Sequence, residues 1–217
     1  MRLFRRHAAT AVSDAADAPP ARLHIGCGQQ SLAGWINIDN QGLPGVDQVL
    51  DVRHGLPFSG IAAIYAEHFL EHLSLDEGLA FLAECRRVLR DDGVLRLSTP
   101  NLDWVMLTHY RGPGATPDDA REDCFRINRA FHGWGHQFLY NATTLESALG
   151  AVGFDRVERC AYGKSDRPEF AGLERHETWE DTPDLPHVLI VEASGTAAPR
   201  PFADQLIKDF REAIGSK

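Results

Sequence analysis

Residues 23–28 read LHIGCG and residues 35–39 read WINID, and this pair of segments decides the fold. Each is a short apolar run of the kind that forms a buried parallel strand. The first run ends in Gly26-Cys27-Gly28, and glycine at either end of this turn brings bare backbone close to a ligand. The second run ends in Asp39, where an acid can accept hydrogen bonds from a ribose diol. The pair therefore predicts a small-molecule site at two adjacent strand ends.

Further apolar runs predict the rest of one sheet. They cover residues 46–51, 61–66, 94–98, 155–162 and 187–192. Strands that alternate with helices are typical of an open sheet covered on both faces. The predicted fold class is α/β, with a Rossmann-like, doubly wound, mostly parallel sheet of about seven strands. Ligands of such sheets bind outside the carboxyl ends of the strands.

Two helices are predicted from capping boxes, in which a Ser or Thr precedes a Glu by three residues. Ser74 with Glu77 is expected to open the first helix, and Asp92-Gly93 to end it. Thr143 with Glu146 is expected to open the second. Apolar residues at helical spacing follow both boxes, so each helix should bury one face.

Residues 101–142 interrupt the alternation, because they are rich in aromatic residues, Gly, Asn and His without a sustained period. An insert of this kind after the fifth strand is typical of a lid over a site. The predicted organisation is a disordered tail at 1–20, one domain at 21–195 and a C-terminal extension at 196–217. The extension is expected to hold a short amphipathic helix whose apolar face is Phe202, Leu206, Phe210 and Ile214.

Composition excludes several classes of protein. The chain has 217 residues, 43% of them hydrophobic, which suits one globular domain. Its net charge of -9 argues against a nucleic-acid partner, since that binding depends on Lys and Arg. Four widely separated cysteines indicate neither a zinc knuckle nor a disulfide framework, and a reducing cytoplasm is expected. No apolar run is long enough for a membrane span, and the first residues lack the apolar core of a secretory signal.

A dinucleotide is the first alternative for the ligand. Its fingerprint needs a third glycine, a helix aimed at the pyrophosphate and an acid about 20 residues further on. Here Ser31 stands at the third position, and Asp39 follows Gly28 by only eleven residues. Residues 29–34 are too few for a crossover helix. A nucleoside ligand without a pyrophosphate is therefore favoured.

Together with these segments, several later motifs carry a family resemblance. They are Leu56-Pro57-Phe58, Leu70-Glu71-His72-Leu73, RVLRDDG at 87–93 and STPN at 98–101. The set resembles class I S-adenosylmethionine-dependent methyltransferases, in particular a methyltransferase type 11-like subgroup with a short first helix. The resemblance covers roughly residues 21–195 and implies S-adenosylmethionine as the cofactor.

The resemblance also implies roles for individual residues. Gly26 and Gly28, with Cys27 packed between them, would approach the methionine part of the cofactor. Asp39 would hold the ribose hydroxyls. The remaining assignments place Asp51 near the adenine amine, or leave it as a turn or cap acid, and place Glu67 and His68 beside the sulfonium and the acceptor.

The implied activity is transfer of a methyl group to a hydroxyl or amine of a small molecule or saccharide. The saccharide is suggested by similarity to proteins of bacterial surface-sugar pathways. Two alternatives stay open. One is a non-catalytic module that binds S-adenosylmethionine or a partner, and the other is a nicotinamide-dependent oxidoreductase.

A hydroxyl acceptor would need a base for its proton, and histidine suits neutral pH. The candidates are His136, His132 and His68, with His136 preferred and hydrogen-bonded lid histidines as the alternative. His132 and His136 have the i, i+4 spacing of a metal pair. Gly133 and Gly135 weaken a helix there, and the sequence reveals no third ligand, so no metal is predicted. Methyl transfer is accordingly expected to be metal-independent.

Overall fold

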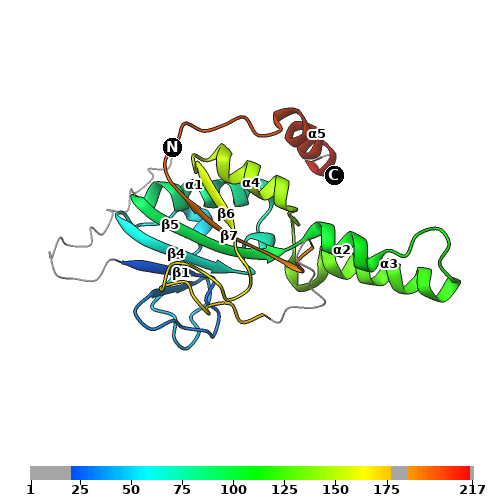
Figure 1. Cartoon of the computed structure of the whole chain (residues 1–217), viewed down its shortest axis with the longest axis horizontal. Coiled ribbons are helices and arrows are strands. Elements are labelled where there is room, and N and C mark those ends of the chain that lie inside the picture. The colour runs from blue at the N-terminus through cyan, green and yellow to red at the C-terminus, as the bar shows by residue number, and fades with distance from the viewer. Residues whose placement is uncertain (1–20, 177–184, 216–217) are drawn as a thin grey trace, which may run out of the picture.

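The structure is a computed structural model that describes residues 21–176 and 185–215. Its centre is one sheet of seven strands in the order β3-β2-β1-β4-β5-β7-β6 (Figure 1). The strands are β1 (Arg22–Ile25), β2 (Ile36–Asp39), β3 (Gln48–Val49), β4 (Ile61–Glu67), β5 (Leu89–Pro100), β6 (Arg156–Arg159) and β7 (Val188–Ser194). The pairs from β3 to β5 are parallel, and β7 is antiparallel to both β5 and β6. The predicted α/β, Rossmann-like, mostly parallel sheet is confirmed.

Helices and short helical turns connect these strands. The α-helices are α1 (Leu75–Val88), α2 (Leu102–His109), α3 (Pro117–His132), α4 (Ala142–Ala151) and α5 (Asp204–Gly215). The 3-10 turns are η1 (Val52–His54), η2 (Leu70–His72) and η3 (Gly133–Gly135). Between β1 and β2 the chain forms only turns, which agrees with the expected lack of a first helix.

The two faces of the sheet are covered differently. On the first face, α1 and α4 pack their apolar sides against the strands in one large cluster that includes Leu82 and Leu149. On the second face, a smaller cluster joins Trp35 and Tyr65 to Phe170, which lies in an irregular segment between β6 and β7. The first face is a conventional helix-on-sheet core, whereas loops cover the second.

Buried polar residues cross the second face in one row. Cross-strand register places His24 opposite Tyr65, Tyr65 opposite Arg96, and Arg96 opposite Glu192. The guanidinium of Arg96 is fully buried and donates to Glu174 at 2.6 Å and to Glu192 at 2.7 Å. A buried charge of this kind needs its partners, because desolvation would otherwise be costly. Arg96 therefore ties the irregular segment that carries Glu174 to the sheet.

The predicted capping box of α1 is confirmed, but the predicted end of this helix is wrong. Ser74 and Glu77 cap each other's backbone, whereas the helix stops at Val88 instead of Asp92-Gly93. Leu89 is already extended and pairs with Ile61, so the strand begins five residues earlier than expected. A side chain at Gly93 would come within 2.8 Å of the Ile61 carbonyl oxygen. Gly93 thus lets β5 lie close to Ile61 of β4, and it does not end the helix.

Two other helix predictions need correction. Helix α4 is capped by Asn141, whose side chain accepts from the Thr144 N–H at 2.9 Å, and not by Thr143. The interval 101–142 is not irregular, because it holds α2 and α3, which lie side by side and extend beyond the sheet (Figure 1). Thr116 followed by Pro117 begins α3, and this N-terminal signal was available in the sequence.

The third predicted strand is much shorter than expected. Only Gln48–Val49 pairs with β2, and both residues are exposed at the edge of the sheet. Asp51 turns the chain away, because its side chain caps η1 by accepting from the Arg53 N–H. The acid at the end of this run therefore has a local structural role.

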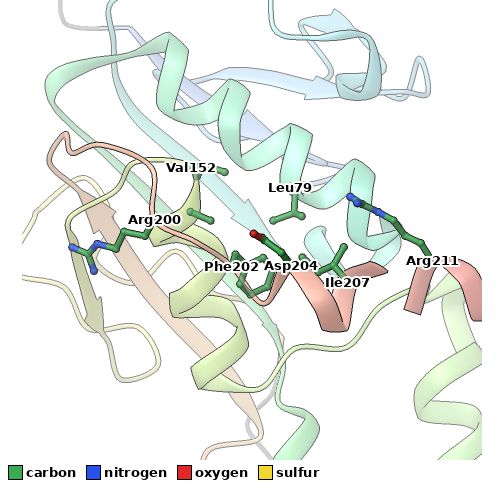
Figure 2. Close-up of a pocket in the computed structure, with 8 residues that line it drawn as sticks. Leu79, Val152, Arg200, Phe202, Asp204, Ile207 and Arg211 are labelled. Carbon is green, nitrogen blue, oxygen red and sulfur yellow. The ribbon is translucent and has the colours of Figure 1, made fainter. Parts of the chain in front are cut away.

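The C-terminal helix is confirmed, but its buried face differs from the prediction. Ile207 is buried, whereas Leu206 and Ile214 are exposed. Arg211 pairs with Asp76 of α1 at 2.5 Å, which fixes how α5 docks. Figure 2 shows Leu79, Val152, Phe202 and Ile207 around a cavity of about 400 Å³ beneath this extension. Its lining comes from α1, the end of α4 and the C-terminal extension and includes no strand residue.

Within the described parts of the chain, no helix has the length and apolar character needed to cross a membrane. The predicted tail at 1–20 lies outside the described residues.

Candidate active site

A second cavity, of about 420 Å³, opens at the carboxyl ends of β1, β2 and β4. Four of the predicted site residues line it, namely Gly26, Asp39, Asp51 and His68. This is the position at which open α/β sheets bind ligands. The residues on the β1–β3 side, Gly26, Gly28, Asp39 and Asp51, are called the glycine-turn half below.

The two glycines have different reasons to be glycine. Gly26 has φ +66°, and a Cβ there would lie 2.4 Å from Cδ2 of Phe69. Gly28 has φ +53°, but a Cβ there would meet nothing within 4 Å. Glycine at position 26 is favoured both by the positive φ and by the close packing of Phe69. Glycine at position 28 is favoured by the positive φ alone, because there is open space beside it.

Asp39 closes the glycine turn from the next strand. One carboxylate oxygen accepts from the Gly28 N–H at 2.9 Å, and the other accepts from the Gln41 N–H at 2.9 Å. Each oxygen has a further lone pair, so the carboxylate can still accept hydrogen bonds from a ligand in the cavity. The residues from Gly28 to Asp39 thus form a loop, and the hydrogen bond between these two residues joins its ends.

Asp51 lines the cavity and is also paired with Arg53. The Arg53 guanidinium donates to both oxygens of Asp51, with the shortest distance 2.6 Å. These hydrogen bonds lower the pKa of the Asp51 carboxyl to about 2. The position of Asp51 is therefore compatible with both of its predicted roles, as the cap of a turn and as a residue that contacts a ligand in the cavity.

The other predicted site residues, Cys27, Gly28, Glu67, His132 and His136, are not among the residues that line the cavity. Cys27 is buried, and burial raises the pKa of its thiol, so it packs within the core and is a poor nucleophile. The Glu67 carboxylate accepts from the backbone N–H groups of Arg175 and His176 at 2.7 and 3.1 Å. Burial opposes ionisation of Glu67, but these hydrogen bonds lower the pKa of its carboxyl.

A group of polar side chains follows β4 on the other side of the cavity. His68 has φ +46°, which is a strained conformation for a residue other than glycine. Its Nδ1 lies 3.0 Å from Oε1 of Glu71, whose side chain is fully buried, and the other Glu71 oxygen accepts from Thr99 at 3.0 Å. Nε2 of His68 is buried and has no hydrogen-bond partner among the described residues.

His136 and His72 complete this side of the site. Nδ1 of His136 lies 2.8 Å from the Ala130 carbonyl oxygen, and its ring is 5.2 Å from that of His72. Glu71, His72 and His136 come together, whereas His132, at the end of α3, is outside this group. The residues His68, Glu71, His72 and His136 are called the histidine half below.

A cover segment, residues 163–176, supports the site, whereas the sequence alone leaves open whether this charged stretch rims an acceptor pocket or is a solvated loop. It crosses the second face of the sheet, where Glu174 meets Arg96, and ends with His176 beside His68 at a ring distance of 4.1 Å. Arg175 donates to Gln30 at 2.5 Å, next to the glycine turn. The only sequence signal was a run of charged residues, whose partners lie far away along the chain.

Comparisons with known proteins bear on the fold. No protein-family model matches the sequence, and no curated protein matches it. Among solved structures, the chain is similar to the S-adenosylmethionine-dependent methyltransferase SibL in its apo form, with 14% identity and a TM-score of 0.52. The match covers 82% of this chain and 51% of SibL, so the chain spans about half the length of that protein.

A second similar structure is a S-adenosylmethionine-dependent methyltransferase from Archaeoglobus fulgidus, with 15% identity and a TM-score of 0.51. This match covers 80% of the chain and 85% of the archaeal protein. Both structures share the architecture that places the cavity at the strand ends. The chain therefore has the Rossmann-like fold of the class I S-adenosylmethionine-dependent methyltransferases.

Proposed function

We propose that the chain is an S-adenosylmethionine-dependent methyltransferase that methylates a hydroxyl or amine of a small molecule or saccharide. The observation that carries the proposal is the glycine turn, which Asp39 holds at the edge of the strand-end cavity in this fold. The sulfonium of the cofactor already carries the electrophilic methyl group, so the displacement itself requires alignment and no metal. The acidic lining of the glycine-turn half suits a cationic cofactor.

In this proposal the glycine-turn half holds the cofactor. The turn from Gly26 to Gly28 approaches the methionine part, Asp39 accepts hydrogen bonds from the ribose, and Asp51 lies beside the adenine. The cofactor set omits Cys27 and Glu67, because the first is packed in the core and the second binds the cover segment. A cofactor bound in this way directs its methyl group toward the histidine half.

His68 is the histidine that we assign to contact with the acceptor. It lines the cavity, and its Nε2 has no hydrogen-bond partner among the described residues; because this atom is buried, a hydroxyl or amine of the acceptor would reach it only after a small rotation of the ring. His136, the preferred candidate from sequence, has Nδ1 bound to a backbone carbonyl, and neither His136 nor His132 lines the cavity. The acceptor would therefore sit between the cofactor and the segment that carries His68.

The cofactor assignment is tested by titrating Asp39→Asn with S-adenosylmethionine. Loss of the charged hydrogen-bond acceptor should weaken binding by about 1–3 kcal/mol relative to the unaltered protein. Asp92→Asn is the matched control, because that side chain is 74% exposed near the N-terminal end of β5, away from the carboxyl ends of the strands, and should leave the affinity unchanged. Equal affinity of all three proteins would remove Asp39 from the cofactor site.

The transferase assignment is tested with S-adenosylmethionine carrying a labelled methyl group. A panel of saccharides, small hydroxyl compounds and amines should include an acceptor that gains the label, and His68→Ala should slow that transfer. Cofactor binding without transfer to any acceptor would favour the non-catalytic binding module. Binding of a nicotinamide nucleotide in place of S-adenosylmethionine would favour the oxidoreductase.

A further inference from the structure

We propose that Glu71, His72 and His136 form a binding site for one divalent transition-metal ion, of which Zn²⁺ is the representative. Each residue offers one donor atom, and the three atoms lie within 4.8 Å of one another. Two imidazoles and one carboxylate suit Zn²⁺ and neighbouring transition metals, whereas Mg²⁺ and Ca²⁺ prefer oxygen ligands alone. The site goes beyond the proposed methyl transfer and does not depend on it.

The donors come from two segments whose backbones are fixed against each other. Glu71 and His72 belong to η2, and His136 follows η3, where the chain returns from α3. The Gln137 N–H donates to the Glu71 carbonyl at 2.7 Å, and the Gln137 side chain donates to the His72 carbonyl at 2.5 Å. These two hydrogen bonds keep the donor residues together without an ion.

The hydrogen bonds of His136 and Glu71 leave lone pairs on their metal-binding atoms available for an ion. Because a carbonyl oxygen only accepts, Nδ1 of His136 carries the proton that it donates to Ala130, and Nε2 keeps its lone pair for an ion. The Glu71 oxygens receive hydrogen bonds from His68 and Thr99, and each retains a further lone pair. Metal-binding histidines and carboxylates are commonly oriented by such outer hydrogen bonds.

The spacing requires only a small adjustment. Tetrahedral bonds of about 2.0–2.1 Å place donor atoms about 3.3 Å apart, so no pair of donors would need to close by more than about 1.5 Å. His72 and His136 are partly exposed, and rotation of their side chains can supply this movement, while the buried Glu71 stays in place. Three protein ligands leave one coordination position open. Because His72 also lines the strand-end cavity, the proposed ion site lies next to this cavity.

The test is a calorimetric titration of chelator-treated, full-length protein with zinc chloride. It is run in a Cys124→Ser background, because that exposed thiol is an alternative zinc ligand. One ion per chain is expected to bind, and His72→Ala and His136→Ala should each weaken binding by roughly tenfold or more. His54→Ala is the matched control, since its side chain is 81% exposed and lies outside the cluster.

Absence of zinc binding, or equal binding by the parent and both cluster variants, would overturn the proposal. Tighter binding of magnesium chloride than of zinc chloride would overturn the assignment to a transition metal. A thermal melt provides a second measurement, because zinc should raise the unfolding temperature of the parent more than that of His136→Ala. Titration of the same metal-free protein with S-adenosylmethionine separates this proposal from the proposed function, since either ligand can bind when the other does not.

Discussion

The glycine-turn half takes all its residues from one stretch of chain, Gly26 to Asp51, whereas the histidine half joins segments that lie far apart. In the first half, the hydrogen bonds that the Asp39 and Asp51 side chains accept span at most eleven residues, as between Gly28 and Asp39. In the second half, Thr99 supports Glu71, and the cover segment is fixed by a contact between Arg96 and Glu174. Local sequence thus specifies the cofactor side, and tertiary structure specifies the other side.

The largest effect is expected from Arg96→Met, which tests whether the buried ion pairs hold the cover segment. Loss of the guanidinium leaves Glu174 buried without its cation and removes one of the two arginine partners of Glu192, which should cost about 3–5 kcal/mol of the free energy of unfolding. Denaturant unfolding measures this change. Arg90→Met is the control, because its pair with Asp92 is exposed and should contribute less than about 1 kcal/mol. Equal losses in the two variants would show that burial of the Arg96 network is unimportant.

A comparison of Gly26→Ala with Gly28→Ala tests the glycine-turn half. Both substitutions place a side chain at positive φ, which should cost about 1–2 kcal/mol. Gly26→Ala adds the contact with Phe69 and should lose about 3 kcal/mol in total. The measurement is the free energy of unfolding without ligand. A larger loss in Gly28→Ala would contradict the described packing of this turn.

Thr99→Val tests the support of the histidine half. It removes the hydrogen bond to the buried Glu71 carboxylate while keeping a β-branched side chain in β5, and should cost about 1.5–3 kcal/mol. Ser98→Ala is a matched neighbour, because the Ser98 hydroxyl has no hydrogen-bond partner among the described residues. Ser98→Ala removes an unpaired buried hydroxyl and should therefore not destabilise the fold. Chemical unfolding of both variants decides whether Thr99 stabilises Glu71.

The smallest effect is expected from Glu67→Gln, and it should depend on pH. Glu67 faces the backbone of Arg175 and His176, the His176 ring and the phenol of Tyr65. Its folded pKa lies below the unfolded value, so its ionised form stabilises the fold above about pH 4.5. This contribution is lost as the pH falls through the folded pKa.

The difference in unfolding free energy between Glu67→Gln and the unaltered protein should therefore be constant near neutral pH and shrink in acid. Measurement of unfolding across the acid range tests this sign. Asp166→Asn is the control, since this exposed side chain lies in the same cover segment. A difference that grows in acid would contradict the assigned hydrogen bonds of Glu67.

The same contrast explains how much the sequence could predict. The strands, the capping box at Ser74 and the residues Gly26 and Asp39 follow from local patterns, because each depends on neighbours in the chain. The early end of α1 was missed because Leu89 pairs with Ile61, a tertiary contact that overrides the helical period. Helix α3 of the insert carried a sequence signal, Thr116-Pro117, that outweighs the irregular composition of this interval.

The histidine half was less predictable for a physical reason. His68, Glu71 and His136 are polar residues whose roles depend on which partner each finds, and those partners are Thr99 and the Ala130 carbonyl. Sequence spacing suggested His132 with His136, but the fold brings His136 to His72. The spacing of residues within one segment cannot predict a cluster of side chains that two distant segments bring together.

Titration of the unaltered protein with S-adenosylmethionine and with its demethylated product, S-adenosylhomocysteine, tests the central claim most directly. Binding of one cofactor molecule per chain is predicted for both ligands, since both share the ribose and adenine that the glycine-turn half would hold. Absence of measurable binding to either ligand would contradict the assignment of the strand-end cavity as a cofactor site.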